Sequence, residues 1–169
     1  MISQEMTDAL NAQINAEIYS AYLYQAMSAQ MAHDGLGGIA NWLALQCQEE
    51  LTHAQRFYNY LLSQGARVEL KAIDEPPAEF NGPLAIFEAV LEHEKKVTAL
   101  IHALADLAVD QKDHATQIML QWFVTEQVEE EEHAAEILDK LKLTGDQGGG
   151  LFMIDKELGA RTFTPAAEE

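Results

Sequence analysis

The sequence predicts an all-α fold: a four-helix bundle with one long crossover between its second and third helices, and a short fifth helix near the C-terminus. Three observations predict it. Four long stretches carry apolar residues at three- and four-residue steps, glycine and proline clusters separate them, and one connector is much longer than the others. With 169 residues, 48% of them hydrophobic, the chain can bury a core. We expect a single domain over residues 1–169, with the bundle at about 4–143.

The first two helices are predicted to form a hairpin. The first runs from about Gln4 to Ala32 without glycine or proline, and the second from Ile39 to about Gln64. The glycine-rich segment 34–38 separates them. Because this link is short, the two helices should be antiparallel.

The third and fourth helices are predicted to form a second hairpin. The third begins near Asn81-Gly82-Pro83, a helix cap followed by a first-turn proline, and runs to about Val109. The fourth runs from about Asp113 to Leu143, and the glycines at 145 and 148–150 end it. A short amphipathic helix is expected at about 151–159.

The connector between the hairpins, Gly65–Gly82, decides the topology. It contains Pro76-Pro77 and so cannot be helical throughout. Extended, it reaches roughly 55–60 Å at about 3.3 Å per residue, whereas each helix is roughly 40 Å long. The connector can therefore cross the bundle lengthwise, which makes helices two and three parallel, as in ferritin-like bundles.

The formal net charge of −18 argues against nucleic acids and anionic membrane surfaces as partners. The negative charge favours cations as partners; the alternative is that it only keeps the protein soluble. The start of the chain lacks a basic segment followed by an apolar run, so we expect no signal peptide, and no apolar stretch is long enough to span a bilayer. The single cysteine, Cys47, cannot form an internal disulfide. These features predict a cytoplasmic protein.

Each predicted buried stripe is interrupted by acidic or other polar side chains. An unpaired buried carboxylate is so costly that it shifts its pKa, finds a partner or coordinates a metal. The four stripes, in chain order, are Leu10, Ile14, Glu17, Ala21 and Tyr24; Ile39, Leu43, Gln46, Glu50, His53, Phe57 and Leu61; Phe87, Leu91, Glu94, Val97 and Ile101; and Leu120, Phe123, Gln127, Glu130, Ala134, Ile137 and Leu141.

The spacing of the polar residues relates the two hairpins, because 94 − 17, 127 − 50 and 130 − 53 all equal 77. A bundle with a pseudo-two-fold axis would bring all six side chains to one level. Five of them offer a carboxylate oxygen or an imidazole nitrogen, a donor set that suits first-row metals such as iron. A structural bundle without metal is the alternative, but none of the ten lysines and arginines interrupts a stripe.

At these positions the sequence resembles the bacterial non-haem ferritins, members of the ferritin-like di-iron carboxylate superfamily, over essentially its whole length. The resemblance implies an iron-storage protein and a ferroxidase. Fe(II) would be oxidised by O2 or H2O2 at a di-iron centre inside each subunit. Ferric oxyhydroxide would collect inside an octahedral shell of 24 identical subunits, with the short fifth helix near a four-fold axis.

The resemblance also implies ligand roles. Glu17, Glu50 and His53 would bind one iron, and Glu50 would bridge to the second. Glu94 and Glu130 would complete the second site. Gln127 would lie beside the pair, and Tyr24 would be an electron or hydrogen-bond donor, its alternative being an ordinary core tyrosine.

A third iron site is implied on the cavity side of the centre. Its residues would be Glu49, Glu126 and Glu129, with Glu130 shared. Glu131 and Glu132 are the better candidates for a solvated acidic face.

Two departures separate the chain from the related bacterioferritins. Those have Glu-x-x-His in the fourth helix, where this chain has Gln127-Val128-Glu129-Glu130, and a haem-binding methionine where this chain has Leu51. Haem is therefore not expected. A soluble di-iron or di-manganese oxidase without storage remains the alternative function, although the fifth helix and the extra acids count against it.

Overall fold

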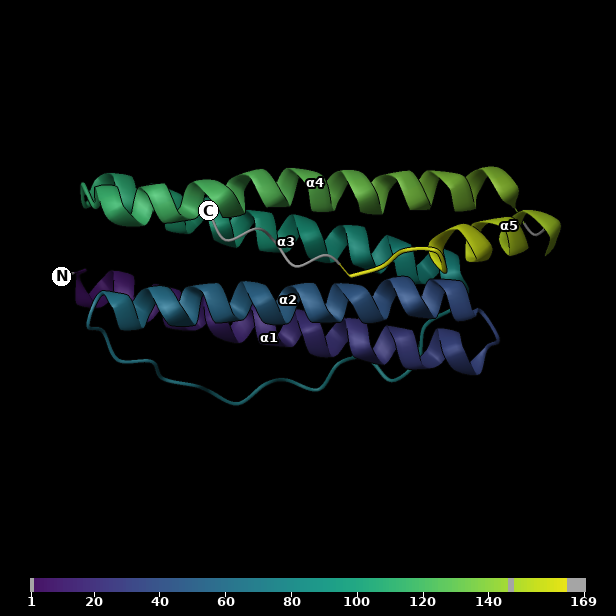
Figure 1. Cartoon of the computed structure of the whole chain (residues 1–169), viewed down its shortest axis with the longest axis horizontal. Coiled ribbons are helices and arrows are strands. Elements are labelled where there is room, and N and C mark those ends of the chain that lie inside the picture. Colours follow the sequence, from purple (N-terminus) through teal and green to yellow (C-terminus); the bar gives the residue numbers. More distant parts are fainter. Residues whose placement is uncertain (1, 146–147, 164–169) are drawn as a thin grey trace.

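The computed structural model describes residues 2–145 and 148–163, and within these ranges the chain is helical apart from its connectors. The predicted fold class is confirmed. Four long helices lie side by side along one axis, and the short α5 packs at one end against α2 and α4 (Figure 1). None of the described helices is long and apolar enough to cross a membrane. The helices are α1 (Gln4–His33), α2 (Gly37–Ser63), α3 (Gly82–Asp110), α4 (His114–Thr144) and α5 (Gly148–Leu158).

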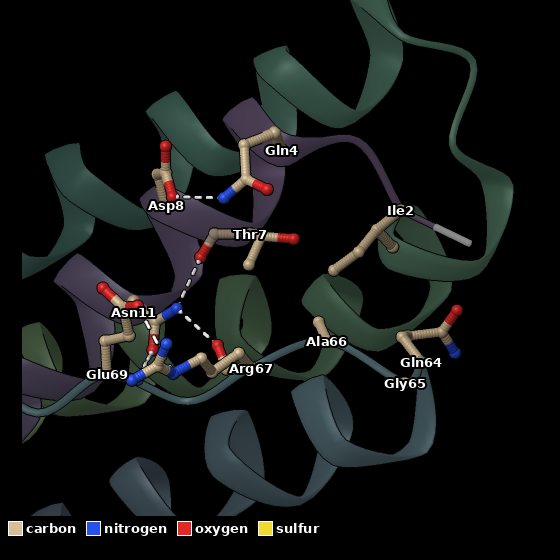
Figure 2. A pocket seen from close by; sticks show the side chains of 10 residues that line it. All are labelled: Ile2, Gln4, Thr7, Asp8, Asn11, Gln64, Gly65, Ala66, Arg67 and Glu69. Carbon is tan, nitrogen blue, oxygen red and sulfur yellow. Dashed lines mark hydrogen bonds and ion pairs between the residues drawn. The ribbon is translucent and has the colours of Figure 1, made fainter.

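The long connector runs lengthwise along α1 (Figure 1). At one end, the Asn11 amide donates to the carbonyl oxygen of Arg67 at 3.0 Å and accepts from the backbone N–H of Glu69 at 2.7 Å (Figure 2). Near the other end, the Gln30 side chain bonds the backbone of Phe80 in both directions, at 2.6 and 2.7 Å. The connector thus delivers α3 to the end of the bundle where α2 begins, which makes α2 and α3 parallel, as predicted.

Two predictions about glycines were wrong. Gly37 and Gly38 lie in the first turn of α2, and Gly148–Gly150 form the first turn of α5, although both runs were expected to be breakers. Gly38 has a packing reason: a Cβ atom there would lie 1.6 Å from the carbonyl oxygen of Asp155 in α5. Glycine at this position lets the two helix backbones touch.

The apolar core is divided by a polar layer. One apolar cluster, which includes Tyr24, Leu43 and Phe87, lies toward α5, and a second, which includes Ile14 and Phe57, lies toward the opposite end. Along every long helix, the polar residues of the predicted stripe fall between the two clusters. The layer comprises Glu17, Glu50, His53, Glu94, Gln127 and Glu130, each at most 5% exposed.

Candidate metal centre

Glu17 of α1 meets Glu50 and His53 of α2 inside the polar layer. One potential ligand atom from each lies within 4.8 Å of the others. Glu50 and His53 are three residues apart on one helix face, and Glu50 Oε2 is 3.6 Å from His53 Nδ1. Two carboxylates and one imidazole that converge in this way can share a single metal ion.

Two oxygen atoms of this cluster lack a hydrogen-bond partner. Across residues 2–145 and 148–163, the buried side-chain atoms without one are Oε2 of Glu17 and Oε2 of Glu50. The other oxygen of Glu17 accepts a bond from the Gln13 amide at 2.7 Å. Because buried polar atoms are almost always bonded, a carboxylate oxygen without a partner on each of two residues of the cluster indicates a place for a cation.

The second hairpin contributes Glu94 and Glu130, whose oxygens accept bonds from neutral donors. The Tyr24 hydroxyl donates to Oε1 of Glu94, and the Gln127 amide donates to Oε2 of the same residue at 3.1 Å. The Gln46 amide donates to Oε2 of Glu130 at 2.7 Å. Tyr24 is buried on the stripe of α1 that carries Glu17, as predicted, and its hydroxyl donates across the bundle to Glu94 of α3.

Burial and mutual repulsion raise the pKa of the central carboxyl groups. Burial is the largest cause in each case, because the charged form loses its hydration. The pKa of Glu50 is raised further by the charges of Glu94 and Glu130, and that of Glu17 by Glu50. The pKa of Glu130 rises to about 8, with Glu94 as the next cause after burial. The metal-free centre therefore retains protons that a bound cation would displace.

The acids implied for a third site are placed unequally. Glu126 is half-buried, with Oε1 4.0 Å from Nε2 of His53, so it adjoins the central cluster. Glu49 is also half-buried, but its Oε2 forms an ion pair of 2.6 Å with Arg161, in the segment after α5. Glu129 is exposed. Glu131, expected on the solvated face, is half-buried and accepts a bond from Thr98 at 2.6 Å.

Sequence reasoning missed two polar neighbours of the centre, Gln13 and Arg161, and it placed Gln46 on the buried stripe of α2 without assigning it a partner. Gln46 lies on the α2 stripe one turn before Glu50, and Gln13 lies one turn before Glu17, so helical spacing could have identified both. Arg161 belongs to no periodic pattern. Its contacts depend on how α5 docks, which the local sequence does not specify.

Comparisons with known proteins identify the family to which the chain belongs. Residues 7–144 match the ferritin-like domain family. The chain belongs to the ferritin family. A bacterial non-heme ferritin from Bacteroides fragilis is 44% identical to this ferritin over 161 residues, which cover 95% of this chain and 100% of that protein. A bacterial non-heme ferritin from Escherichia coli is 41% identical over 158 residues, covering 94% and 96% of the two chains.

Solved structures agree with the fold of this ferritin. An Archaeoglobus fulgidus ferritin engineered into a closed form is 51% identical, with a TM-score of 0.96 over 97% of this chain and 100% of that one. The open-pore ferritin from the same archaeon is 50% identical, with a TM-score of 0.95 over 96% and 100%. Family membership and the Glu17, Glu50 and His53 cluster support metal binding and iron storage.

Proposed function

We propose that this ferritin oxidises Fe(II) at a di-iron centre within each subunit and stores the product as ferric oxyhydroxide inside a hollow shell of 24 subunits in the cytoplasm. The observation that carries the proposal is the convergence of Glu17, Glu50 and His53, with two buried carboxylate oxygens unpaired. Fe(II) is the substrate in this proposal. Carboxylate oxygens are hard ligands, so they bind the Fe(III) product more strongly than the Fe(II) substrate.

Glu17, Glu50 and His53 would bind the first Fe(II). Glu50 would bridge to a second Fe(II), bound by Glu94 and Glu130. Gln127 and Tyr24, both bonded to Glu94, would keep that carboxylate oriented. Each Fe(II) gives up one electron. With O2 as oxidant, two electrons and two protons yield H2O2; with H2O2 and two protons, they yield two molecules of water.

The raised pKa values of the central carboxyl groups support a role in proton release. Binding of Fe(II) requires the carboxylate form, so it would displace protons from Glu17, Glu50 and Glu130. Those protons would be released as the metal enters, near the place where reduction of the oxidant consumes them.

Assembly and storage are supported by surface features as well as by family membership. Leu143, Phe152 and Met153, at or next to α5, are 63–88% exposed, as expected of apolar side chains that contact further copies. The third site, at Glu49, Glu126, Glu129 and Glu130, would accept iron on the side from which product leaves.

The test compares Glu50→Gln with Glu132→Gln, an exposed position on α4. In stopped-flow oxidation at two Fe(II) per subunit, the rate of the fast phase should be at least about 100-fold lower in Glu50→Gln, because the substitution removes a carboxylate shared by both ions. Glu132→Gln should oxidise iron like the unaltered protein. Normal oxidation by Glu50→Gln would refute the site assignment.

Storage is tested by size-exclusion chromatography after aerobic addition of Fe(II) in large excess. Iron that co-elutes with a very large assembly supports storage. A small species that retains about two metals per chain would favour the non-storing oxidase instead.

A further inference from the structure

A positively charged side chain from the C-terminal segment lies against the metal centre. After α5 the chain turns back along the bundle (Figure 1), and the Asn41 amide donates to the carbonyl oxygen of Arg161 at 3.1 Å. The Asp155 carboxylate accepts a bond of 2.9 Å from the backbone N–H of Ile39, which joins α5 to the start of α2. These contacts fix the point from which the Arg161 side chain extends toward α2.

The Arg161 guanidinium bridges two side chains on α2. One nitrogen donates to Oε2 of Glu49 at 2.6 Å, and the other donates to the amide oxygen of Gln46. The amide nitrogen of Gln46 in turn donates to Oε2 of Glu130 at 2.7 Å. Arginine suits this position because its planar fork can serve two acceptors at once, which a lysine cannot do with the same geometry.

The bridge occupies one oxygen on each of two carboxylates that belong to the proposed third metal site. Oε2 of Glu49 is bound to Arg161 directly, and Oε2 of Glu130 is bound to it through Gln46. The guanidinium also places a fixed positive charge beside the site. A metal ion that binds there either displaces these hydrogen bonds or is limited to the remaining oxygen of each carboxylate, and in both cases it approaches a cation.

We propose that Arg161 is a positioning residue that weakens the third metal site by competing with metal for Glu49 and, through Gln46, for Glu130. Iron is then held strongly by the central pair of sites and only loosely by the third. The loose third site becomes a point of transit, from which an ion moves on when the guanidinium returns to Glu49.

The inference rests on the proposed function, because it requires the central sites to bind metal. It also makes a separate statement, since a chain with a normal di-iron centre could have a third site that Arg161 does not affect.

The test is an anaerobic titration of the metal-free, assembled protein with Fe(II), followed by isothermal calorimetry. Arg161→Gln should tighten the third Fe(II) per subunit by about 10-fold, because a charge-assisted hydrogen bond no longer competes for Glu49. The first Fe(II) ion, assigned to Glu17, Glu50 and His53, should bind as in the unaltered protein, because none of these three side chains is bonded to Arg161 or Gln46.

Two further variants make the result specific. Arg67→Gln removes the same charge from the exposed connector, where Arg67 is 85% exposed and pairs only at the surface with Glu69, and it should leave all three affinities unchanged. Glu49→Gln should weaken the third site and abolish most of the gain from Arg161→Gln in the double variant.

Each contrary outcome is decisive. An unchanged or weaker third site in Arg161→Gln overturns the inference, as does a gain that persists in full in the Glu49→Gln background. Binding of two Fe(II) and no third in every variant also overturns it and leaves the di-iron proposal intact. If the unaltered protein binds no Fe(II) at all, the proposed function itself fails.

Discussion

The buried carboxylates of the central layer are satisfied mainly by neutral donors. Gln13 bonds Glu17, Tyr24 bonds Glu94, and Gln46 bonds Glu130. A neutral amide or phenol can move away from a carboxylate without leaving a second buried charge, whereas a lysine or arginine cannot. These donors thus hold the carboxylates in place and leave them available to a metal.

The raised pKa values predict that the metal-free protein loses stability as pH rises. Glu130 has a pKa of about 8 in the folded protein and an ordinary, lower value when unfolded. Between those values the folded state binds more protons, so each such group lowers the free energy of unfolding by up to about 1.4 kcal/mol per pH unit. The stability that depends on a protonated Glu130 is fully present below the unfolded pKa, about 4.3, and it is lost as pH rises through the folded pKa.

Glu130→Gln should therefore flatten this dependence. Denaturant unfolding of the metal-free protein between about pH 5 and pH 8 should show a shallower fall in stability than the unaltered protein. Glu132→Gln, which changes an exposed acid on the same helix, is the control and should keep the original slope. Equal slopes for Glu130→Gln and its control would show that Glu130 is already ionised.

At the residue scale, the sequence could predict which polar side chains are buried better than it could predict their hydrogen-bond partners. Helical periodicity placed Glu17, Glu50 and Glu94 on buried faces, and the offset of 77 paired Glu17 with Glu94 and Glu50 with Gln127. It could not predict that Tyr24 would bond Glu94, because that contact depends on how α1 and α3 are rotated against each other. The roles of these residues as iron ligands remain predictions.

At the scale of elements, the contact between α2 and α5 controls what the C-terminal segment can reach. Gly38 lies against the backbone of Asp155, and Gly159 lies close by, with its own Cβ position 3.2 Å from Cα of Gly38. The two segments could not approach each other this closely if either position carried a side chain. Arg161 follows two residues after this contact, so its position depends on it.

Gly38→Ala should separate α5 from α2. The added Cβ would meet the Asp155 carbonyl oxygen at 1.6 Å, and the backbone must move, at a cost of about 1–3 kcal/mol. Thermal unfolding should show a lower Tm. Gly37→Ala is the matched control: its Cβ would meet nothing within 4 Å, and it should leave stability unchanged or raise it by up to about 1 kcal/mol. Equal Tm values for the two variants would contradict the close contact.

Most elements were predictable from the sequence, and the exceptions share a cause. Each long helix begins and ends close to its predicted bounds, because apolar periodicity and Gly65 or Pro83 mark the ends. The runs at 37–38 and 148–150 were misjudged because local propensity treats glycine as a breaker. Here the requirement at Gly38 comes from a neighbouring helix, which a local pattern cannot show.

At the scale of the whole molecule, the net charge of −18 should govern how Fe(II) arrives. We expect the rate of oxidation at limiting Fe(II) to fall several-fold as salt rises from about 0.01 to about 0.1 M, where the screening length shortens from about 30 to about 10 Å. Rates at saturating Fe(II) should change little, because the central layer is buried. Stopped-flow absorbance measures both, and equal slowing under the two conditions would argue against steering.

The lengthwise connector has a consequence for folding. It divides the chain into two hairpins whose contacts are mostly local, and local contacts form quickly. Glu17, Glu50 and His53 all belong to the first hairpin, whereas Glu94 and Glu130 belong to the second. In the proposed assignment, a half-folded or half-synthesised chain could capture one Fe(II) but would lack the partner ion. Oxidation at the proposed centre would then start only when the two hairpins dock, so a nascent chain would be spared the peroxide that oxidation by O2 would yield.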